Sequence, residues 1–209
     1  MRNAIGSTGR GEKGKAGRDS CRRSARGSAK DFFPYSEILA EIARCMKRIK
    51  SEQVRGLADA ISGARRIFMA GAGRSGLVAR MFAVRLTHLG RQVHVLGEST
   101  APACCGGDLL IIVSGSGRTG GLLHLPARAH SVGVRVALIT ASPDSPLARE
   151  ADLKVIVPVA RGGKTESMQF AGSLFEQCAM ICLEALVLNL MRRLRQSEER
   201  MVARHQNLE

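Results

Sequence analysis

The chain has 209 residues, of which 44% are apolar and 3% aromatic with no Trp, so we expect one aliphatic core. It shows no apolar run of the ~18 to 20 residues that a membrane span requires, and its first residues lack the apolar core of a secretory signal. The six cysteines form no C-x-x-C motif and no disulfide-framework spacing, so we expect a cytoplasmic protein that binds no metal.

The formal net charge of +14 is unevenly distributed along the chain. Residues 1–30 carry nine Lys or Arg against two acidic residues, which gives +7, and contain almost nothing apolar. Such a segment cannot offset its ordering entropy by burying surface, so a disordered basic tail is expected. It is either a solvated leader or a nucleic-acid-binding tail, and the lack of interleaved aromatic residues does not favour nucleic acid as a partner.

The predicted elements begin at residue 35, where apolar residues recur at helical spacing as far as Ile61 and predict an N-terminal helical arm that ends at Gly63. Short apolar runs then alternate with helical patterns. The predicted strands are 66–70, 92–96, 108–113, 135–140 and 153–157. The predicted helices are 75–89, 119–131, 146–150 and 172–195.

This alternation predicts an α/β fold: a five-stranded parallel sheet flanked by helices, doubly wound and flavodoxin-like. The domain is expected to cover residues 31–195, and residues 196–209 to form a charged tail that frays. The last predicted helix is apolar nearly all round and includes Cys178 and Cys182, which we expect to be reduced core residues. Because such a helix needs cover on every side, we expect a homo-oligomer, either a dimer or a tetramer.

Polar loops follow the first three predicted strands, at residues 71–76, 97–100 and 114–120. Open parallel sheets bind ligands at this end of their strands. Residues 71–76 (GAGRSG) fit the dinucleotide fingerprint G-x-G-x-x-G, and Glu98 stands about where a ribose-binding acid would be, so NAD is one alternative. Residues 114–120 (SGSGRTG) bring three hydroxyls to a helix N-terminus, which suits a phosphate monoester, although helix capping would also use them. These hydroxyls belong to Ser114, Ser116 and Thr119.

The two glycine-rich loops resemble those of the SIS (sugar isomerase) domain family, whose members bind sugar phosphates. Within that family, the stretches RLTHLG at 85–90, DLLIIVSGSGRT at 108–119 and GSLFEQ at 172–177 are similar to the 6-phospho-3-hexuloisomerases. The resemblance runs from about residue 35 to residue 195. It departs at Phe170-Ala171, where the family often has Pro-Met, and at the loop 104–107 (CCGG), both of which we expect near the site.

The resemblance implies interconversion of D-arabino-hex-3-ulose 6-phosphate and fructose 6-phosphate through an enediolate, without metal or other cofactor. It implies Glu176 as the base and His88 as the proton shuttle between oxygens, acting in its own or a neighbouring subunit. The expected phosphate-binding residues are Ser75, Ser114, Ser116 and Thr119. Further expected substrate contacts are Gly73, Arg74, Ser99, Thr100 and Arg118.

Three alternatives remain open at this point. The protein could isomerise another sugar phosphate, such as that of a pentose or a heptose. It could be a sugar-phosphate sensor that performs no catalysis. It could also bind NAD through the first loop. On residue type alone, Glu176 could be a helix-capping residue and His88 a packing residue, and the pair Cys104-Cys105 lacks the base partner that thiol catalysis would need.

Overall fold

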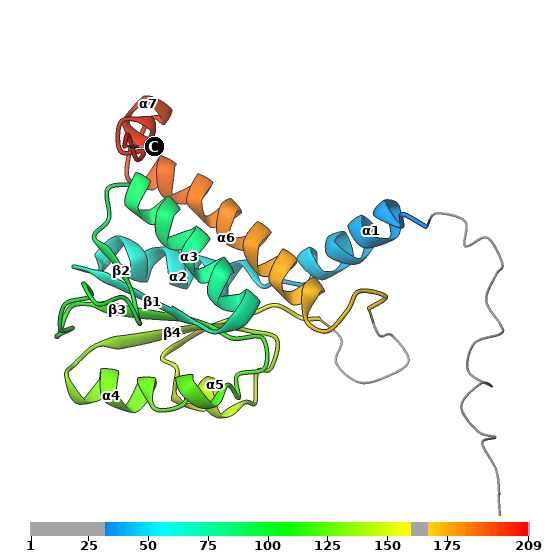
Figure 1. The fold of residues 1–209 in the computed structure, drawn as a ribbon, viewed down its shortest axis with the longest axis horizontal. Coiled ribbons are helices and arrows are strands. Elements are labelled where there is room, and N and C mark those ends of the chain that lie inside the picture. Colours follow the sequence, from blue (N-terminus) through cyan, green and yellow to red (C-terminus); the bar gives the residue numbers. More distant parts are fainter. Residues whose placement is uncertain (1–31, 160–166, 209) are drawn as a thin grey trace, which may run out of the picture. The chain divides into compact units, whose positions relative to one another are not determined.

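Five parallel strands form the sheet in the computed structural model, which describes residues 32–159 and 167–208 (Figure 1). The predicted basic tail, residues 1–30, lies outside the described part of the chain. The strand order is β2-β1-β3-β4-β5, so the predicted doubly wound sheet is confirmed. The strands are β1 (Ile67–Gly71), β2 (Val93–Val95), β3 (Leu109–Val113), β4 (Arg135–Thr140) and β5 (Leu153–Ile156).

The direction of winding reverses between β1 and β3, the two central neighbours. From β1 the chain moves to β2 at one edge, whereas β3, β4 and β5 follow one another toward the other edge. Gly71 at the end of β1 pairs in register with Val113 at the end of β3, so the loops after these strands begin at the same level. Such a reversal opens a crevice beyond the carboxyl ends of the strands, where ligands bind in folds of this kind.

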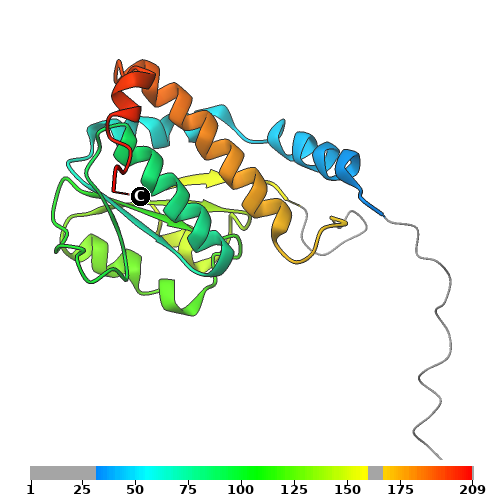
Figure 2. The ribbon, with the colours of Figure 1, turned by 45° about the horizontal axis from the view of Figure 1, so that its top comes forward.

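Helices cover both faces of the sheet (Figures 1 and 2). One face packs against α2, α3 and α6 around an aliphatic core, and the other packs against α4 and α5. Helix α1 lies against α6, and the short α7 contacts α3. The helices are α1 (Tyr35–Met46), α2 (Ser51–Gly63), α3 (Gly73–His88), α4 (Leu125–Ser131), α5 (Pro146–Glu150), α6 (Ser173–Arg193) and α7 (Glu198–Val202).

The structure corrects two predicted helices and the predicted end of the chain. The N-terminal arm is two helices, because the chain turns between Met46 and Ser51. The predicted helix 119–131 is a 3₁₀ turn at Gly120–Leu122 followed by α4, because adjacent glycines weaken the helix start and Pro126 fits only a first turn. The end of the chain, expected to fray, contains α7, whose first turn is capped by the Ser197 hydroxyl.

The expectation that no segment is long and apolar enough to span a membrane is wrong for α6. Its length and composition would allow it to cross a membrane. The helix also fits a core position: residues such as Cys178, Cys182 and Leu186 are buried in the main hydrophobic cluster. It packs against α1, α2 and α3. The prediction that Cys178 and Cys182 are core residues is confirmed, and α6 is the core helix of this domain.

The glycine-rich turn after β1 owes its first and last glycines to close packing. A Cβ atom on Gly71 would lie 2.8 Å from the Gly76 Cα, and one on Gly76 would lie 2.8 Å from the Gly71 carbonyl oxygen. These contacts involve backbone atoms, which cannot move aside as a flexible side chain can. The first turn of α3 therefore sits directly against the end of β1 and brings Ser75 to the crevice.

The loop 104–107 lies at the amino-terminal edge of the sheet, contrary to the expectation that it borders the site. The buried Asp108 carboxylate, immediately before β3, accepts hydrogen bonds from Arg65 (3.2 Å), Arg66 (2.7 Å) and the Cys105 backbone N–H (2.9 Å). Burial raises the pKa of Asp108, but these donors outweigh it and hold the pKa at about 2. This cluster fastens the loop to the starts of β1 and β3.

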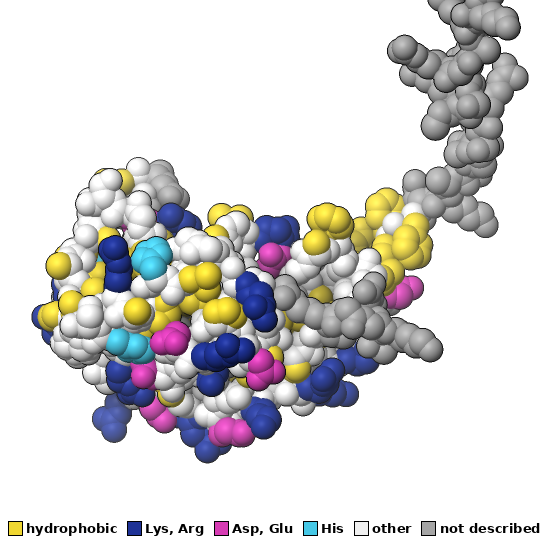
Figure 3. Space-filling model, turned by 90° about the horizontal axis from the view of Figure 1, so that it is seen from below, with side chains coloured by type: hydrophobic (Ala, Val, Ile, Leu, Met, Phe, Trp, Pro, Cys, Tyr) yellow, Lys and Arg dark blue, Asp and Glu magenta, His cyan; other side chains and the backbone are white. Residues whose placement is uncertain are grey.

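The charged side chains on the face that carries α4 and α5 are of both signs. Figure 3 shows Lys and Arg interspersed there with Asp and Glu. His130 and Asp152 lie 3.1 Å apart on this part of the molecule. The positive charge on this face does not form a single strip of the kind that follows a nucleic-acid backbone.

Candidate active site

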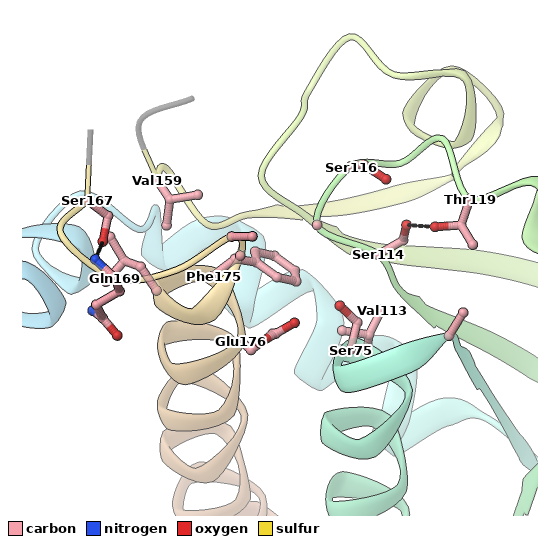
Figure 4. Close-up of a pocket in the computed structure, with 15 residues that line it drawn as sticks. Ser75, Val113, Ser114, Ser116, Thr119, Val159, Ser167, Gln169, Phe175 and Glu176 are labelled. Carbon is pink, nitrogen blue, oxygen red and sulfur yellow. Dashed lines mark hydrogen bonds between the residues drawn. The ribbon is translucent and has the colours of Figure 1, made fainter. Parts of the chain in front are cut away.

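A cavity of about 530 Å³ opens at the crevice between the ends of β1 and β3 (Figure 4). The first turn of α3 contributes Ser75, and the loop after β3 contributes Ser114, Ser116 and Thr119. The start of α6 contributes Phe175 and Glu176. The structure thus brings all four predicted phosphate-binding residues and the predicted base to one cavity.

The loop after β3 is held in shape by its own hydroxyls. The backbone N–H of Gly117 donates to Ser114 Oγ (3.2 Å), and that of Arg118 donates to Ser116 Oγ (3.2 Å). Ser114 Oγ and Thr119 Oγ1 are 3.3 Å apart. Ser114 is buried, so it shapes the loop, whereas Ser116 accepts in the loop and keeps its own O–H to donate to a ligand.

Glu176 lies on α6 near the middle of the cavity (Figure 4). The loop after β3, residues 114–120 (the serine loop), lies on one side of it, and Ser167 and Gln169 lie on the other. The carboxylate of Glu176 forms an ion pair with Arg74 from the first turn of α3, and only 12% of the Glu176 side chain is exposed. The neighbouring Phe175 packs against the loop after β3 so closely that a Cβ on Gly115 would meet the Phe175 ring at 2.8 Å. Gly115 therefore lets the serine loop approach the helix that carries Glu176.

The other predicted substrate contacts do not line this cavity. Gly73 begins α3 with a positive φ of 54°, and Arg74 reaches the site through its ion pair with Glu176. Ser99, Thr100 and Arg118 are exposed on loops outside the lining. Glu98, on which the NAD alternative partly depended, forms a 2.6 Å ion pair with Arg80.

His88 is at the other end of α3 from the cavity. Ser75 and His88 are 13 residues apart on this helix, so about 20 Å separates them along its axis. His88 is 6% exposed, and its ring centroid lies 5.1 Å from that of His205. The structure therefore does not bring His88 and Glu176 together within one chain.

Sequence reasoning missed the wall formed by Ser167 and Gln169, which line the cavity beside Ala171 and Gly172. No motif marks these two residues, although the resemblance to the family departs at Phe170-Ala171 next to them. Phe170 is 88% exposed, and Ala171 belongs to the lining. Among residues 32–159 and 167–208, no group of three or more His, Cys, Asp or Glu is arranged to hold a metal ion.

The fold and the site define a class: an open, doubly wound α/β protein with a hydroxyl-rich loop and a carboxylate at its switch point. The model of the SIS domain family matches residues 60–181, more than half of the chain, and the chain belongs to this family.

Named relatives make the assignment within this family more specific. A 3-hexulose-6-phosphate isomerase from Mycobacterium gastri is 46% identical over 177 residues, covering 83% of this chain and 89% of the relative. The protein of the same name from Bacillus subtilis is 41% identical over 178 residues, covering 83% and 96%. This name denotes the same activity as 6-phospho-3-hexuloisomerase. The chain is therefore a sugar-phosphate isomerase of the SIS family, and the resemblance is confirmed.

A solved structure supports the fold assignment. A protein from Methanococcus jannaschii, whose inferred molecular function is 3-hexulose-6-phosphate isomerase, matches with a TM-score of 0.75 at 32% identity. The match covers 83% of this chain and 98% of the solved chain.

Proposed function

We propose that the protein interconverts D-arabino-hex-3-ulose 6-phosphate and fructose 6-phosphate. The observation that carries the proposal is the cavity in which hydroxyls of the serine loop and the carboxylate of Glu176 face one space. The names of the relatives point to the same substrate. Two alternatives would use the same loop: the isomerisation of another sugar phosphate, and the binding of a sugar phosphate without catalysis. An activity assay with defined substrates distinguishes them.

In the proposed reaction, Ser75, Ser116 and Thr119 donate hydrogen bonds to the phosphate, together with N–H groups of the loop. Glu176 removes the proton from C2 of the hexulose, the electron pair of the C2–H bond forms the C2–C3 double bond, and the π pair of the C3 carbonyl moves to O3 to give an enediolate. The same carboxyl group returns the proton to C3, while a second group moves a proton from O2 to O3. The ketone thereby moves from C3 to C2.

His88 of the partner subunit is the proposed second group. Burial lowers the pKa of His88, and the neighbouring His205 and Arg85 lower it further. A histidine with a lowered pKa is neutral at pH 7, so one ring nitrogen can accept a proton while the other donates one. Gly73, Arg74, Ser99, Thr100 and Arg118 stay predicted substrate contacts.

An apolar stripe on α3 and α6 is the surface through which we propose that the subunits associate. Leu77, Met81 and Val84 recur along one side of α3 and are 61%, 49% and 53% exposed, and Leu188 on α6 is 62% exposed. A twofold axis that reverses the direction of α3 would bring the His88 end of one copy to the cavity end of the other.

The proposed reaction predicts that the purified protein forms fructose 6-phosphate from the hexulose phosphate, followed through an enzyme that consumes fructose 6-phosphate. The variant Ser116→Ala should raise KM about tenfold with a smaller change in kcat, because it removes one donor to a charged phosphate. An unchanged KM would contradict the loop assignment. Turnover of a pentose or heptose phosphate alone, or binding without turnover, would contradict the substrate or the catalysis.

If each site takes Glu176 from one subunit and His88 from the other, two inactive variants should restore activity when they form mixed dimers. His88→Asn and Glu176→Gln should each be inactive alone, whereas a heterodimer has one site with both residues intact. Equal amounts allowed to exchange subunits should therefore recover about a quarter of the wild-type activity. The measurement is activity after mixed refolding, with each variant refolded alone as the control. No recovery in a mixture shown to contain heterodimers would contradict a shared site.

A further inference from the structure

The carboxylate of Glu41, on α1, accepts three hydrogen bonds from the wall of the cavity. Ser167 Oγ (2.6 Å) and Gln169 Nε2 (3.1 Å) donate to Glu41 Oε2, and the backbone N–H of Met168 donates to Glu41 Oε1 (2.9 Å). All three donors belong to one short segment, residues 167–169. Burial raises the pKa of Glu41, but these bonds outweigh it and leave the pKa below its usual value, so the group is ionised at neutral pH.

This segment is part of the site. Ser167 and Gln169 line the cavity, and the backbone N–H of Gln169 donates to Ser167 Oγ (3.1 Å). The chain then enters α6, where the N–H of Ser173 donates to the Phe170 carbonyl oxygen (3.1 Å). Glu41 thus fixes the wall that leads into the helix carrying Glu176.

The wall lies across the cavity from the serine loop. Figure 4 shows Ser167 and Gln169 on one side, Ser116 and Thr119 on the other, and Glu176 between them. A hexulose with its 6-phosphate in the serine loop and C2 and C3 beside Glu176 has its C1 hydroxymethyl group at the far end. That end meets the wall.

We propose that Glu41 is a positioning residue, which holds Ser167 and Gln169 in place to receive the C1 end of the sugar. This inference rests on the proposed function, because that function sets the direction of the substrate in the cavity.

Attachment of α1 to the domain does not depend on Glu41. Cys45 is buried in the main core, and Ile42 and Met46 pack against that core. These residues hold α1 against α6, whereas the three hydrogen bonds to the Glu41 carboxylate come from residues 167–169. Replacing the carboxylate should therefore disturb the wall more than the fold.

The test is Glu41→Gln in the full chain. One carboxylate oxygen becomes an NH₂ donor, which cannot accept from the segment. KM for the hexulose phosphate should rise about tenfold, with kcat changed less than about threefold. The inhibition constant of glycerol phosphate, which is too short to span from the serine loop to the wall, should stay unchanged. Glu41→Asp, which keeps the charge on a shorter side chain, should recover part of the KM.

The matched control is Glu37→Gln, one turn earlier on α1, because the Glu37 carboxylate accepts from the exposed Ser36. It should behave as wild type. A Glu41→Gln variant with a lower Tm but unchanged KM, or with KM and the glycerol phosphate constant raised equally, would overturn the proposal. If that variant does not fold, Glu41→Asp carries the same comparison.

Binding of fructose 6-phosphate, measured by calorimetry, separates the two proposals. A wild type that binds this ligand without turnover contradicts the proposed reaction only. In that event the dissociation constant of Glu41→Gln carries the test: an approximately tenfold weaker binding supports the role of Glu41, and unchanged binding overturns it.

Discussion

Glu176→Gln is expected to lower kcat by about 100-fold or more, because the amide cannot accept the proton from C2. The exchange preserves size, so KM should change much less than kcat. Steady-state kinetics with the hexulose phosphate measure both constants, and thermal unfolding shows that the variant is folded. A variant that keeps more than about a tenth of wild-type kcat would show that another group is the base.

An ion pair between helices that lies away from the cavity offers a control. Asp59 of α2 pairs with Arg193 near the end of α6 (2.5 Å), whereas Glu176 near the start of α6 pairs with Arg74. Asp59→Asn removes a carboxylate and an interhelical ion pair without touching the cavity lining or the apolar stripe of α3 and α6. Its kcat should remain within about threefold of wild type, because neither partner borders the site.

Asp108→Asn is expected to lower the free energy of unfolding by about 3 kcal/mol. The buried carboxylate accepts from two guanidinium groups and one backbone N–H, and the amide would turn a donor toward them. Urea unfolding measures the change. Asp59→Asn is the control, because Asp59 pairs with Arg193 while two-thirds exposed, and its effect should stay below about 1 kcal/mol. A loss below about 1 kcal/mol for Asp108→Asn would contradict the stabilising role of the hydrogen bonds to this carboxylate.

The lowered pKa of Asp108 also gives the sign of the pH dependence. The folded state holds this pKa at about 2, below the ordinary 3.8, so the ionised group stabilises the protein at neutral pH. That contribution, about 2 kcal/mol, should disappear as the pH falls from about 4 to about 2. The Asp108→Asn variant should lack this part of the acid dependence.

Sequence was sufficient for the sheet and for the serine loop. Alternating short apolar runs and helical patterns fixed the parallel topology, and the end of each strand then placed its loop at one edge. Ser75, Ser116 and Thr119 could be assembled in this way, because each follows a strand directly. The same reasoning failed for loop 104–107, which precedes a strand and so lies at the opposite edge.

Contacts between helices were beyond sequence reasoning. The Arg74–Glu176 pair joins α3 to α6, and Glu41 reaches residues 167–169 from the start of the domain. Such pairs depend on how helices pack, which their periodicity does not specify. The separation of Ser75 from His88, in contrast, was implicit in the sequence, since one predicted helix already held them near its two ends.

The mutual approach of Gly71 and Gly76 bears on how genomes are searched for coenzyme-dependent enzymes. In this chain the outer glycines of the pattern are required because a strand and a helix touch there, a demand that exists before any ligand is considered. Pattern searches for G-x-G-x-x-G will therefore collect isomerases of phosphorylated sugars along with nicotinamide-dependent oxidoreductases. The residues that follow β3 are the better discriminator, because three closely spaced hydroxyls there have no counterpart in the fingerprint itself.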